Sequence, residues 1–182
     1  METFLTHEMY EVYLEIYLAC LALRVPEVQT ILEMKYPSVG IESSYQDQAV
    51  QPNVKKIITM IKGQGSSKPK SLRTAFTEIN KIFLISTWEI LKETATYKKI
   101  DTQPDIQFYR HIRNGCAHDN RFNFDELKYP AEWRDKTITI ALKGTSVIPD
   151  FIKDGDPLLL LIDITNKYFK PIDMEGFKPY PP

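Results

Sequence analysis

The sequence predicts an all-α fold, a helical bundle into which a small β-hairpin is inserted after the helix that begins near residue 104. Apolar residues recur at helical spacing along most of the chain, and they alternate with a period of two only at 137–142. Pro26, Pro104 and Pro157 stand where first helical turns are expected. With 182 residues, 43% of them hydrophobic, the chain can bury one core. We therefore expect one domain over residues 1–182.

Helices dominate the first half of the predicted fold. The segment at 38–50 is predicted to be a loop, and Gly-Gln-Gly-Ser-Ser-Lys-Pro-Lys at 63–70 is the clearest break in the apolar pattern. The apolar residues between these breaks follow the 3.6-residue period of a helix that is buried on one side. The expected helices cover residues 3–25, 27–34, about 52–61, and 71–99.

The second half is expected to contain two further helices and the hairpin. One helix begins at Pro104, after a turn. Thr-Ile-Thr-Ile-Ala-Leu at 137–142, a Lys-Gly turn and residues 145–148 predict a hairpin insertion at about 135–150. Asp156-Pro157 is predicted to cap a last helix at 158–170. The proline-rich tail at about 173–182 is expected to be extended.

Composition limits the classes of function. The formal net charge of −1 excludes a chain-wide basic surface, so any anion site must come from local clustering. Cys20 and Cys116 show no metal-like spacing, which favours a reduced, intracellular protein. The N-terminus lacks a basic and apolar leader, and the longest apolar run, at 158–162, is too short to span a bilayer. We expect a cytoplasmic protein that uses no membrane, metal or cofactor.

The most informative segment is Arg-His-Ile-Arg-Asn-Gly-Cys-Ala-His-Asp-Asn-Arg at 110–121. It holds three arginines and two histidines, with Asp119 as its one acid. At about 100° per residue, one apolar stripe faces the core and an acid-free polar face lies opposite, with Arg113 and His118 roughly 140° apart. The stripe contains Phe108, Tyr109, Ile112 and Cys116, and the polar face contains Arg110, His111, Arg113, Asn114, His118 and Arg121.

Each residue type on this face suits a phosphate ligand or phosphate chemistry. Arginine offers a rigid fork of donors that matches phosphate oxygens and can stabilise a phosphorane. Histidine titrates near neutrality and can transfer a proton. Gly115 removes a side chain and allows another backbone or a ligand to approach closely. A basic helix face is nevertheless often plain solvated surface.

A family resemblance adds to this interpretation. Arg113-Asn114-Gly115-Cys116-Ala117-His118 is similar to the Arg-(polar)-x3-His signature of the HEPN superfamily (higher eukaryotes and prokaryotes nucleotide-binding). The string at 113–123 resembles bacterial abortive-infection and plasmid-borne HEPN proteins, as do Pro-Ala-Glu-Trp-Arg at 130–134 and Gly-Asp-Pro-Leu-Leu-Leu at 155–160. The resemblance covers roughly residues 70–172, and the N-terminal third fits only as helical.

The resemblance implies a HEPN-like bundle that forms a homodimer with two motifs facing each other in a cleft. It implies a metal-independent endoribonuclease of a phage-defence or toxin type, which leaves a 2′,3′-cyclic phosphate and a 5′-hydroxyl. His118 would act on the 2′-hydroxyl or the leaving oxygen, Arg113 would steady the phosphate, and Asn114 would position one or the other. An antitoxin or regulator is a possible further partner. Some relatives carry a modifiable tyrosine where this chain has Asn120, so that form of regulation is unsupported here.

Further basic residues predict contacts to RNA, and two other functions stay open. Residues 48–77 contain six basic residues and no acid, but the glycines lack the spacing of a phosphate-binding loop. This patch could steer an RNA backbone, although a solvated loop is the simpler interpretation. One alternative function is a non-catalytic HEPN-like module that binds RNA or a nucleotide or dimerises; another is a helical scaffold in which the Arg-His pair is a structural cap. The candidate RNA-binding residues are Arg110, Arg121, His111, Lys68, Lys70 and Arg73.

Overall fold

The computed structural model describes residues 2–36, 53–62 and 72–171. The predicted loops at 38–50 and 63–70 and the predicted tail lie outside the described residues, as do Lys68 and Lys70. The chain divides into two compact units. The first unit comprises residues 1–13 and 77–182, and the second comprises 14–76. The expectation of one domain over 1–182 stays a prediction.

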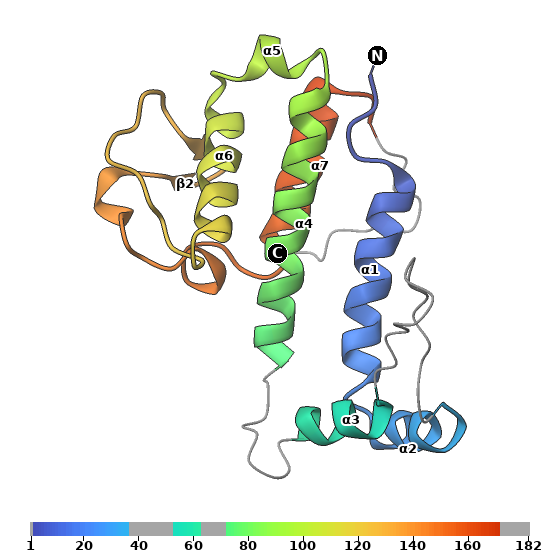
Figure 1. The fold of residues 1–182 in the computed structure, drawn as a ribbon. Coiled ribbons are helices and arrows are strands. Elements are labelled where there is room, and N and C mark those ends of the chain that lie inside the picture. Colours follow the sequence, from blue (N-terminus) through green and yellow to red (C-terminus); the bar gives the residue numbers. More distant parts are fainter. Residues whose placement is uncertain (1, 37–52, 63–71, 172–182) are drawn as a thin grey trace, which may run out of the picture. The chain divides into compact units, whose positions relative to one another are not determined.

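The described chain is mostly helical and contains one small antiparallel hairpin, which confirms the predicted all-α class (Figure 1). Within the described residues, no helix is long and apolar enough to cross a membrane. The helices are α1 (His7–Ala22), α2 (Pro26–Lys35), α3 (Val54–Lys62), α4 (Leu72–Glu93), α5 (Tyr97–Ile100), α6 (Pro104–Ala117) and α7 (Asp156–Tyr168). The hairpin pairs β1 (Glu132–Trp133) with β2 (Lys136–Thr137), and two short turns follow, η1 (Ile140–Leu142) and η2 (Val147–Phe151).

The second unit is built on the contact between α2 and α3. Ile58 of α3 is almost completely buried, as its amphipathic pattern predicts. Gln29 of α2 is also buried, and its side-chain amide donates to the Leu23 carbonyl at 2.8 Å, so its polar group is satisfied. The rings of Tyr17 and Phe76 stack with their centroids 4.2 Å apart.

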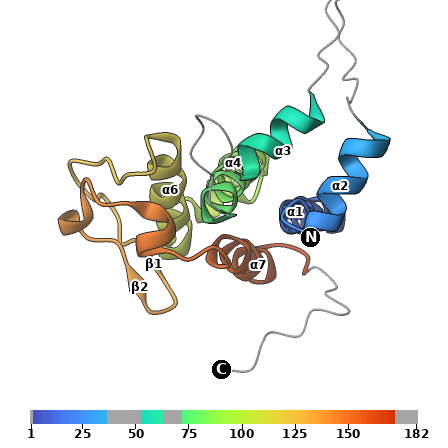
Figure 2. The same ribbon diagram turned by 90° about the horizontal axis from the view of Figure 1, so that it is seen from below.

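The core of the first unit surrounds α6. Helix α6 packs on β1, η2 and α7, and the chain from 121 to 151 covers the side of α6 that faces away from α4 (Figures 1 and 2). Tyr109 joins α6 to α4, because its ring meets Trp88 edge-on at 5.0 Å and its hydroxyl donates to the Leu84 carbonyl at 2.8 Å. A buried tyrosine whose hydroxyl is satisfied anchors two helices in a fixed register.

Helix α6 begins where the sequence predicts and ends earlier than the helical wheel assumed. Pro104 occupies the first turn, after Gln103 in an extended conformation. The helix ends at Ala117, because Asp119 and Asn120 adopt left-handed backbone angles (φ 53° and 58°). Asp and Asn tolerate this region better than other residues that carry a Cβ. His118 and Arg121 therefore do not continue the polar face of α6.

The predicted hairpin at 137–148 is wrong in position. The paired strands lie earlier, at β1 and β2, and the turn between them places Arg134 at φ 52°, without the Asn-Gly or Asp-Gly signature of a two-residue hairpin. Of the alternating isoleucines, Ile138 is buried but Ile140 is 53% exposed. Residues 140–142 form η1, and Ser146 pairs with Arg121 instead. A short alternating run does not determine its own partner.

The predicted helix at 71–99 is interrupted. Helix α4 ends at Glu93, and α5 follows as a separate short turn. The Thr94 hydroxyl donates to the Leu91 carbonyl at 2.7 Å and accepts the Tyr97 backbone N–H at 3.1 Å. These local bonds compete with the helical pattern and turn the chain. The turn brings it round to Pro104.

Candidate functional site

The predicted apolar stripe of α6 is confirmed. Phe108, Tyr109, Ile112 and Cys116 are all buried. Burial raises the pKa of the Cys116 thiol to about 12 and also raises the pKa of Tyr109, so neither group ionises near neutrality. These side chains therefore belong to the core, and any chemistry of α6 must come from its other face.

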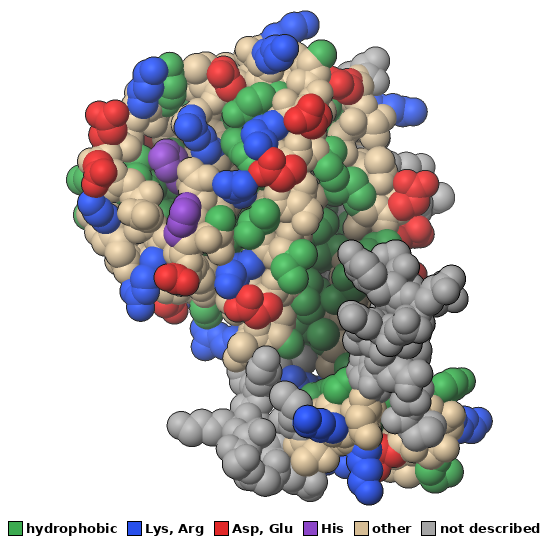
Figure 3. All heavy atoms as spheres, in the orientation of Figure 1, with side chains coloured by type: hydrophobic (Ala, Val, Ile, Leu, Met, Phe, Trp, Pro, Cys, Tyr) green, Lys and Arg blue, Asp and Glu red, His purple; other side chains and the backbone are tan. Residues whose placement is uncertain are grey.

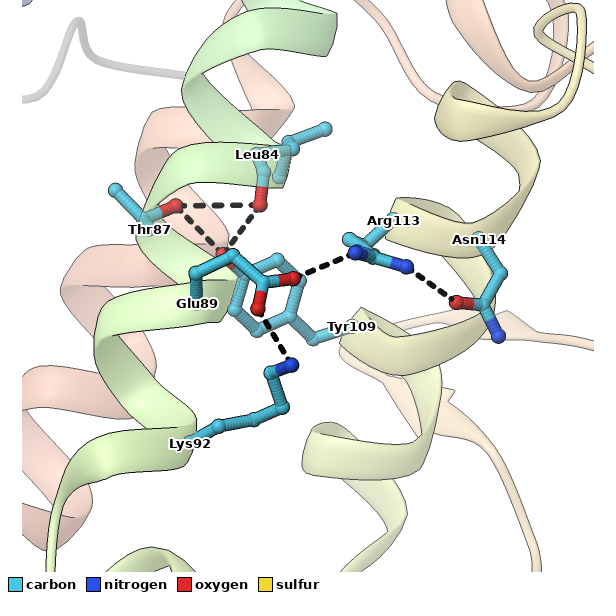
Figure 4. Close-up of polar contacts among 7 residues, drawn as sticks. All are labelled: Leu84, Thr87, Glu89, Lys92, Tyr109, Arg113 and Asn114. Atoms are coloured by element: carbon cyan, nitrogen blue, oxygen red, sulfur yellow. Dashed lines mark hydrogen bonds and ion pairs between the residues drawn. The ribbon is translucent and has the colours of Figure 1, made fainter.

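Arg113 points from α6 toward α4, where Glu89 holds its guanidinium (Figure 4). Its Nη2 donates to Glu89 Oε1 at 2.5 Å, and its Nη1 donates to Asn114 Oδ1 at 3.2 Å. The Arg113 side chain is 24% exposed, and its Nε is buried without a hydrogen-bond partner in the described part of the chain. The guanidinium is thus fixed in direction by two of its five N–H donors, and the buried Nε–H is among those left unused.

Glu89 is the residue that sequence reasoning missed. Its second carboxylate oxygen lies 2.5 Å from Lys92 Nζ, so one acid links two cations. The hydrogen bond from Lys92, followed by that from Arg113, keeps the pKa of Glu89 below its usual range. The polar face carries no acid of its own on α6, but α4 supplies one. A contact between residues 24 positions apart leaves no local signal in the sequence.

Gly115 is required by close packing inside the protein. A Cβ at this position would lie 2.5 Å from Val147 Cγ2 and 3.2 Å from the Arg121 carbonyl oxygen. Val147 is fully buried, so it has little room to retreat. The close approach that the glycine was expected to allow is made by this chain's own residues after the motif, and no ligand is needed to explain it.

His118 caps the C-terminal end of α6 and starts a tightly bonded loop. Its backbone N–H donates to the carbonyls of Asn114 and Gly115, both at 3.1 Å. Asn120 fixes the loop to η2, because its side-chain amide donates to the Ile148 carbonyl and accepts the Ile148 N–H at 3.1 Å. The His118 side chain is exposed and has no hydrogen-bond partner among the described residues. The imidazole is therefore exposed, while the backbone that carries it is held by hydrogen bonds.

A cleft of about 440 Å³ opens beside His118. Its walls are the chain that follows α6 and the turn at 143–144. The sequence predicted this turn, and the structure confirms it. The two walls are joined by backbone bonds, with Phe122 N–H donating to Thr145 O at 3.0 Å and Gly144 N–H donating to Phe122 O at 2.8 Å. The polar side chains that line the cleft are His118, Asp119, Arg121, Asn123 and Lys143.

The other predicted RNA-binding residues lie in different surroundings. Arg110 is exposed on α6. His111 is half-buried with its ring 5.3 Å from that of Phe124, and burial, with a smaller effect of Arg110, lowers its pKa. Arg73 is exposed at the start of α4, in the second unit. Figure 3 shows histidine side chains surrounded by lysines and arginines, with acidic side chains interspersed. The surface is therefore mixed in charge.

The structure separates the two ends of the motif. His118 and Arg121 line one cleft, whereas Arg113 and Asn114 are bonded to each other beside α4. In the part of the chain that the structure describes, no three His, Cys, Asp or Glu side chains gather where they could hold a metal ion. Comparisons with models of known protein families, with curated proteins and with solved structures give no match.

This arrangement offers two kinds of chemistry. The exposed imidazole can take or give a proton within a cleft that also presents cations. The Arg113 guanidinium already holds a carboxylate, and a phosphate presents the same kind of oxygen pair to an arginine fork. Proton transfer and anion stabilisation are thus available, but from two different places on the chain.

Proposed function

We propose that this protein is a metal-independent, HEPN-like endoribonuclease of a phage-defence or toxin type, acting as a homodimer in the cytoplasm. The observation that carries the proposal is the exposed His118 imidazole, held at a rigid helix end in a cleft with Arg121 and Lys143. A proton-transferring group beside cations is what cleavage of a phosphodiester by its own 2′-hydroxyl needs.

The reaction requires two proton movements and one displacement. The ribose 2′-oxygen loses its proton and bonds to phosphorus, the bond from phosphorus to the 5′-oxygen breaks, and that oxygen gains a proton. The products are a 2′,3′-cyclic phosphate and a 5′-hydroxyl. His118 transfers a proton at one of the two oxygens, while Arg113 stabilises the charge on the phosphorane. Asn114 orients the guanidinium through the bond from Arg113 Nη1.

A composite site across two protomers accounts for the separation of Arg113 and His118. Glu89 draws the guanidinium toward α4, while the imidazole lies in the cleft beyond the end of α6. Near Glu89, α4 exposes Ile82 (65%) and Ile90 (42%). Exposed apolar residues beside a functional arginine are consistent with a contact surface for a second copy.

The decisive experiment measures RNA cleavage in EDTA by the wild type, His118→Ala and the surface control Lys98→Ala. We expect cleavage by the wild type and the control, with cyclic phosphate ends, and none by His118→Ala. Equal cleavage by all three would remove His118 from the site. RNA binding without cleavage by any of them would favour the non-catalytic module, which the same basic cleft supports.

A mixing experiment tests the composite site. Arg113→Ala and His118→Ala should each be inactive when pure. If each site takes its arginine from one protomer and its histidine from the other, a mixed dimer contains one intact site, and random exchange restores about a quarter of wild-type activity. Mixing restores nothing if both residues act from the same protomer.

A further inference from the structure

The cleft beside His118 contains a cation that the motif does not include. Lys143 stands on the opposite wall, in the turn that Gly144 closes at φ 81°. The backbone bonds between Phe122, Gly144 and Thr145 hold this wall against the chain that leaves α6. The position of Lys143 relative to His118 is therefore set by the fold, although 25 residues separate them in sequence.

The second cation of the cleft is fixed in place. Arg121 Nη1 donates to the Gly144 carbonyl at 2.7 Å, which anchors the guanidinium to the same turn. A guanidinium carries five N–H donors, so four remain for a ligand. Arg121 and Lys143 thus line one space from both walls, together with His118 and Asp119. A volume of about 440 Å³ lies within the range of clefts that hold small ligands.

Lys143 forms an ion pair with Asp125, and a phosphate can replace the Asp125 carboxylate. Its Nζ lies 2.6 Å from Asp125 Oδ1, and the Asp125 side chain is 93% exposed. This hydrogen bond lowers the pKa of Asp125, so the acid is ionised near neutrality and balances the lysine. Exposed ion pairs are weak and screened by salt. A phosphodiester entering the cleft can therefore take the place of the Asp125 carboxylate at little cost.

We propose that this cleft is the subsite for the nucleotide next to the scissile phosphate, and that Lys143 is a positioning residue that binds its phosphodiester in exchange for Asp125. The inference rests on the proposed function, because it takes the ligand to be the RNA strand on which His118 acts. Lys143 and Arg121 bind backbone oxygens and not base edges, so the subsite holds RNA of any sequence. It places the strand, and His118 carries out the proton transfer.

The test measures binding without cleavage. The probe is a short fluorescent 2′-O-methyl oligoribonucleotide, which lacks the attacking hydroxyl, and its Kd is measured by anisotropy over a series of salt concentrations. We expect Lys143→Ala to raise Kd about three- to tenfold and to reduce the slope of log Kd against log salt by about 0.7, the value for one phosphate contact in a single strand. Lys143→Arg should bind like the wild type.

Asp125 provides the complementary variant. Asp125→Asn should lower Kd by a smaller factor, about two- to threefold, because the weak exposed pair with Lys143 no longer has to be displaced when RNA binds. In the double variant Asp125→Asn with Lys143→Ala, that gain should vanish. Lys98→Ala is the matched control, because Lys98 is also exposed but lies on α5, which precedes α6, a 14-residue helix about 20 Å long that ends at the cleft. It should change neither Kd nor the salt slope.

The outcomes separate this inference from the proposed function. In one outcome, Lys143→Ala binds the probe more weakly and with a smaller salt slope while no variant cleaves ordinary RNA. That result would support the RNA-binding cleft and contradict the proposed nuclease activity. Cleavage that depends on His118, with wild-type Kd and slope in Lys143→Ala, would keep the nuclease and overturn the subsite. A wild type that does not bind the probe, or an Asp125→Asn gain that survives without Lys143, would also overturn it.

Discussion

Replacing Gly115 with alanine tests how the loop after the motif is held against α6. In a helix, alanine is favoured over glycine by about 1 kcal/mol. Here the new Cβ would lie 2.5 Å from Val147 Cγ2, so atoms must move. Overpacking of a dense core costs about 1–3 kcal/mol. The clash outweighs the helical preference, and we expect Gly115→Ala to lower the free energy of unfolding by about 1 kcal/mol.

A double-mutant cycle isolates the cause. Val147→Ala removes two buried methyl groups and should cost about 2 kcal/mol. Combined with Gly115→Ala, it removes the 2.5 Å contact, and the new Cβ fills part of the space. The double variant should then lose about 1 kcal/mol, roughly 2 kcal/mol less than the sum of the single losses. The contact with the Arg121 carbonyl at 3.2 Å remains, but a shift of a few tenths of an ångström relieves it.

Urea denaturation followed by tryptophan fluorescence measures this effect. Trp88 and Trp133 both pack against α6, on Tyr109 and Phe108, and report on its unit. Gly155→Ala is the matched control, since a Cβ there meets nothing within 4 Å, and it should change stability by no more than about 0.5 kcal/mol. Additive losses in the cycle, or a Gly115→Ala variant as stable as the wild type, would refute the argument from steric contact.

Three further substitutions have expected outcomes. Arg113→Lys should slow single-turnover RNA cleavage in EDTA by about tenfold or more, because lysine lacks the two-nitrogen fork, whereas Lys98→Arg should cleave normally; equal rates would deny the guanidinium its role. Burial, together with Arg110, keeps the pKa of His111 below 6.5, so the unfolded chain binds the proton more readily and stability rises with pH up to about 6.5. In His111→Gln this part of the pH slope should disappear from urea midpoints measured between about pH 5 and 7, and a slope that persists would contradict it. Asn120→Asp keeps the acceptor for the Ile148 N–H but sets a carboxylate against the Ile148 carbonyl, and should cost about 1–3 kcal/mol by thermal or urea unfolding, whereas an unchanged midpoint would show that the bond is dispensable.

The parts of the fold that were predicted correctly depend on local signals. The apolar stripe of α6 follows from a 3.6-residue period, and its start follows from Pro104, whose fixed backbone angle suits a first turn. The end of α6 also has a local signal in the sequence, because Asp119-Asn120 is a pair of residues that tolerate left-handed angles. No glycine marks the stop, and a helical wheel that runs past Ala117 therefore places Arg121 on a face of α6 that it does not share.

The parts that were missed depend on partners that are distant in the chain. The strand-like segment near 145 pairs with Arg121 and not with 137–142, and the period of a segment contains no information on its partner. Lys143 reaches the cleft only through that pairing. Glu89 meets Arg113 where α4 packs on α6, a contact to which Tyr109 contributes through its bond to Leu84. Each of these contacts is tertiary, so no pattern within one segment could indicate it.

Glu89 also gives the separation of Arg113 and His118 a physical basis. The helical wheel separated them by about 140° on the assumption that both belong to α6. The structure shows that the assumption is wrong, because α6 ends at Ala117, before His118. Two separate contacts, which we call anchors, hold the two side chains instead. The guanidinium is drawn to α4 by an acid, and the imidazole is held at the cleft by the turn after Ala117. If one protomer supplies Arg113 and a second supplies His118 to the same phosphate, as we propose, both anchors can stay intact.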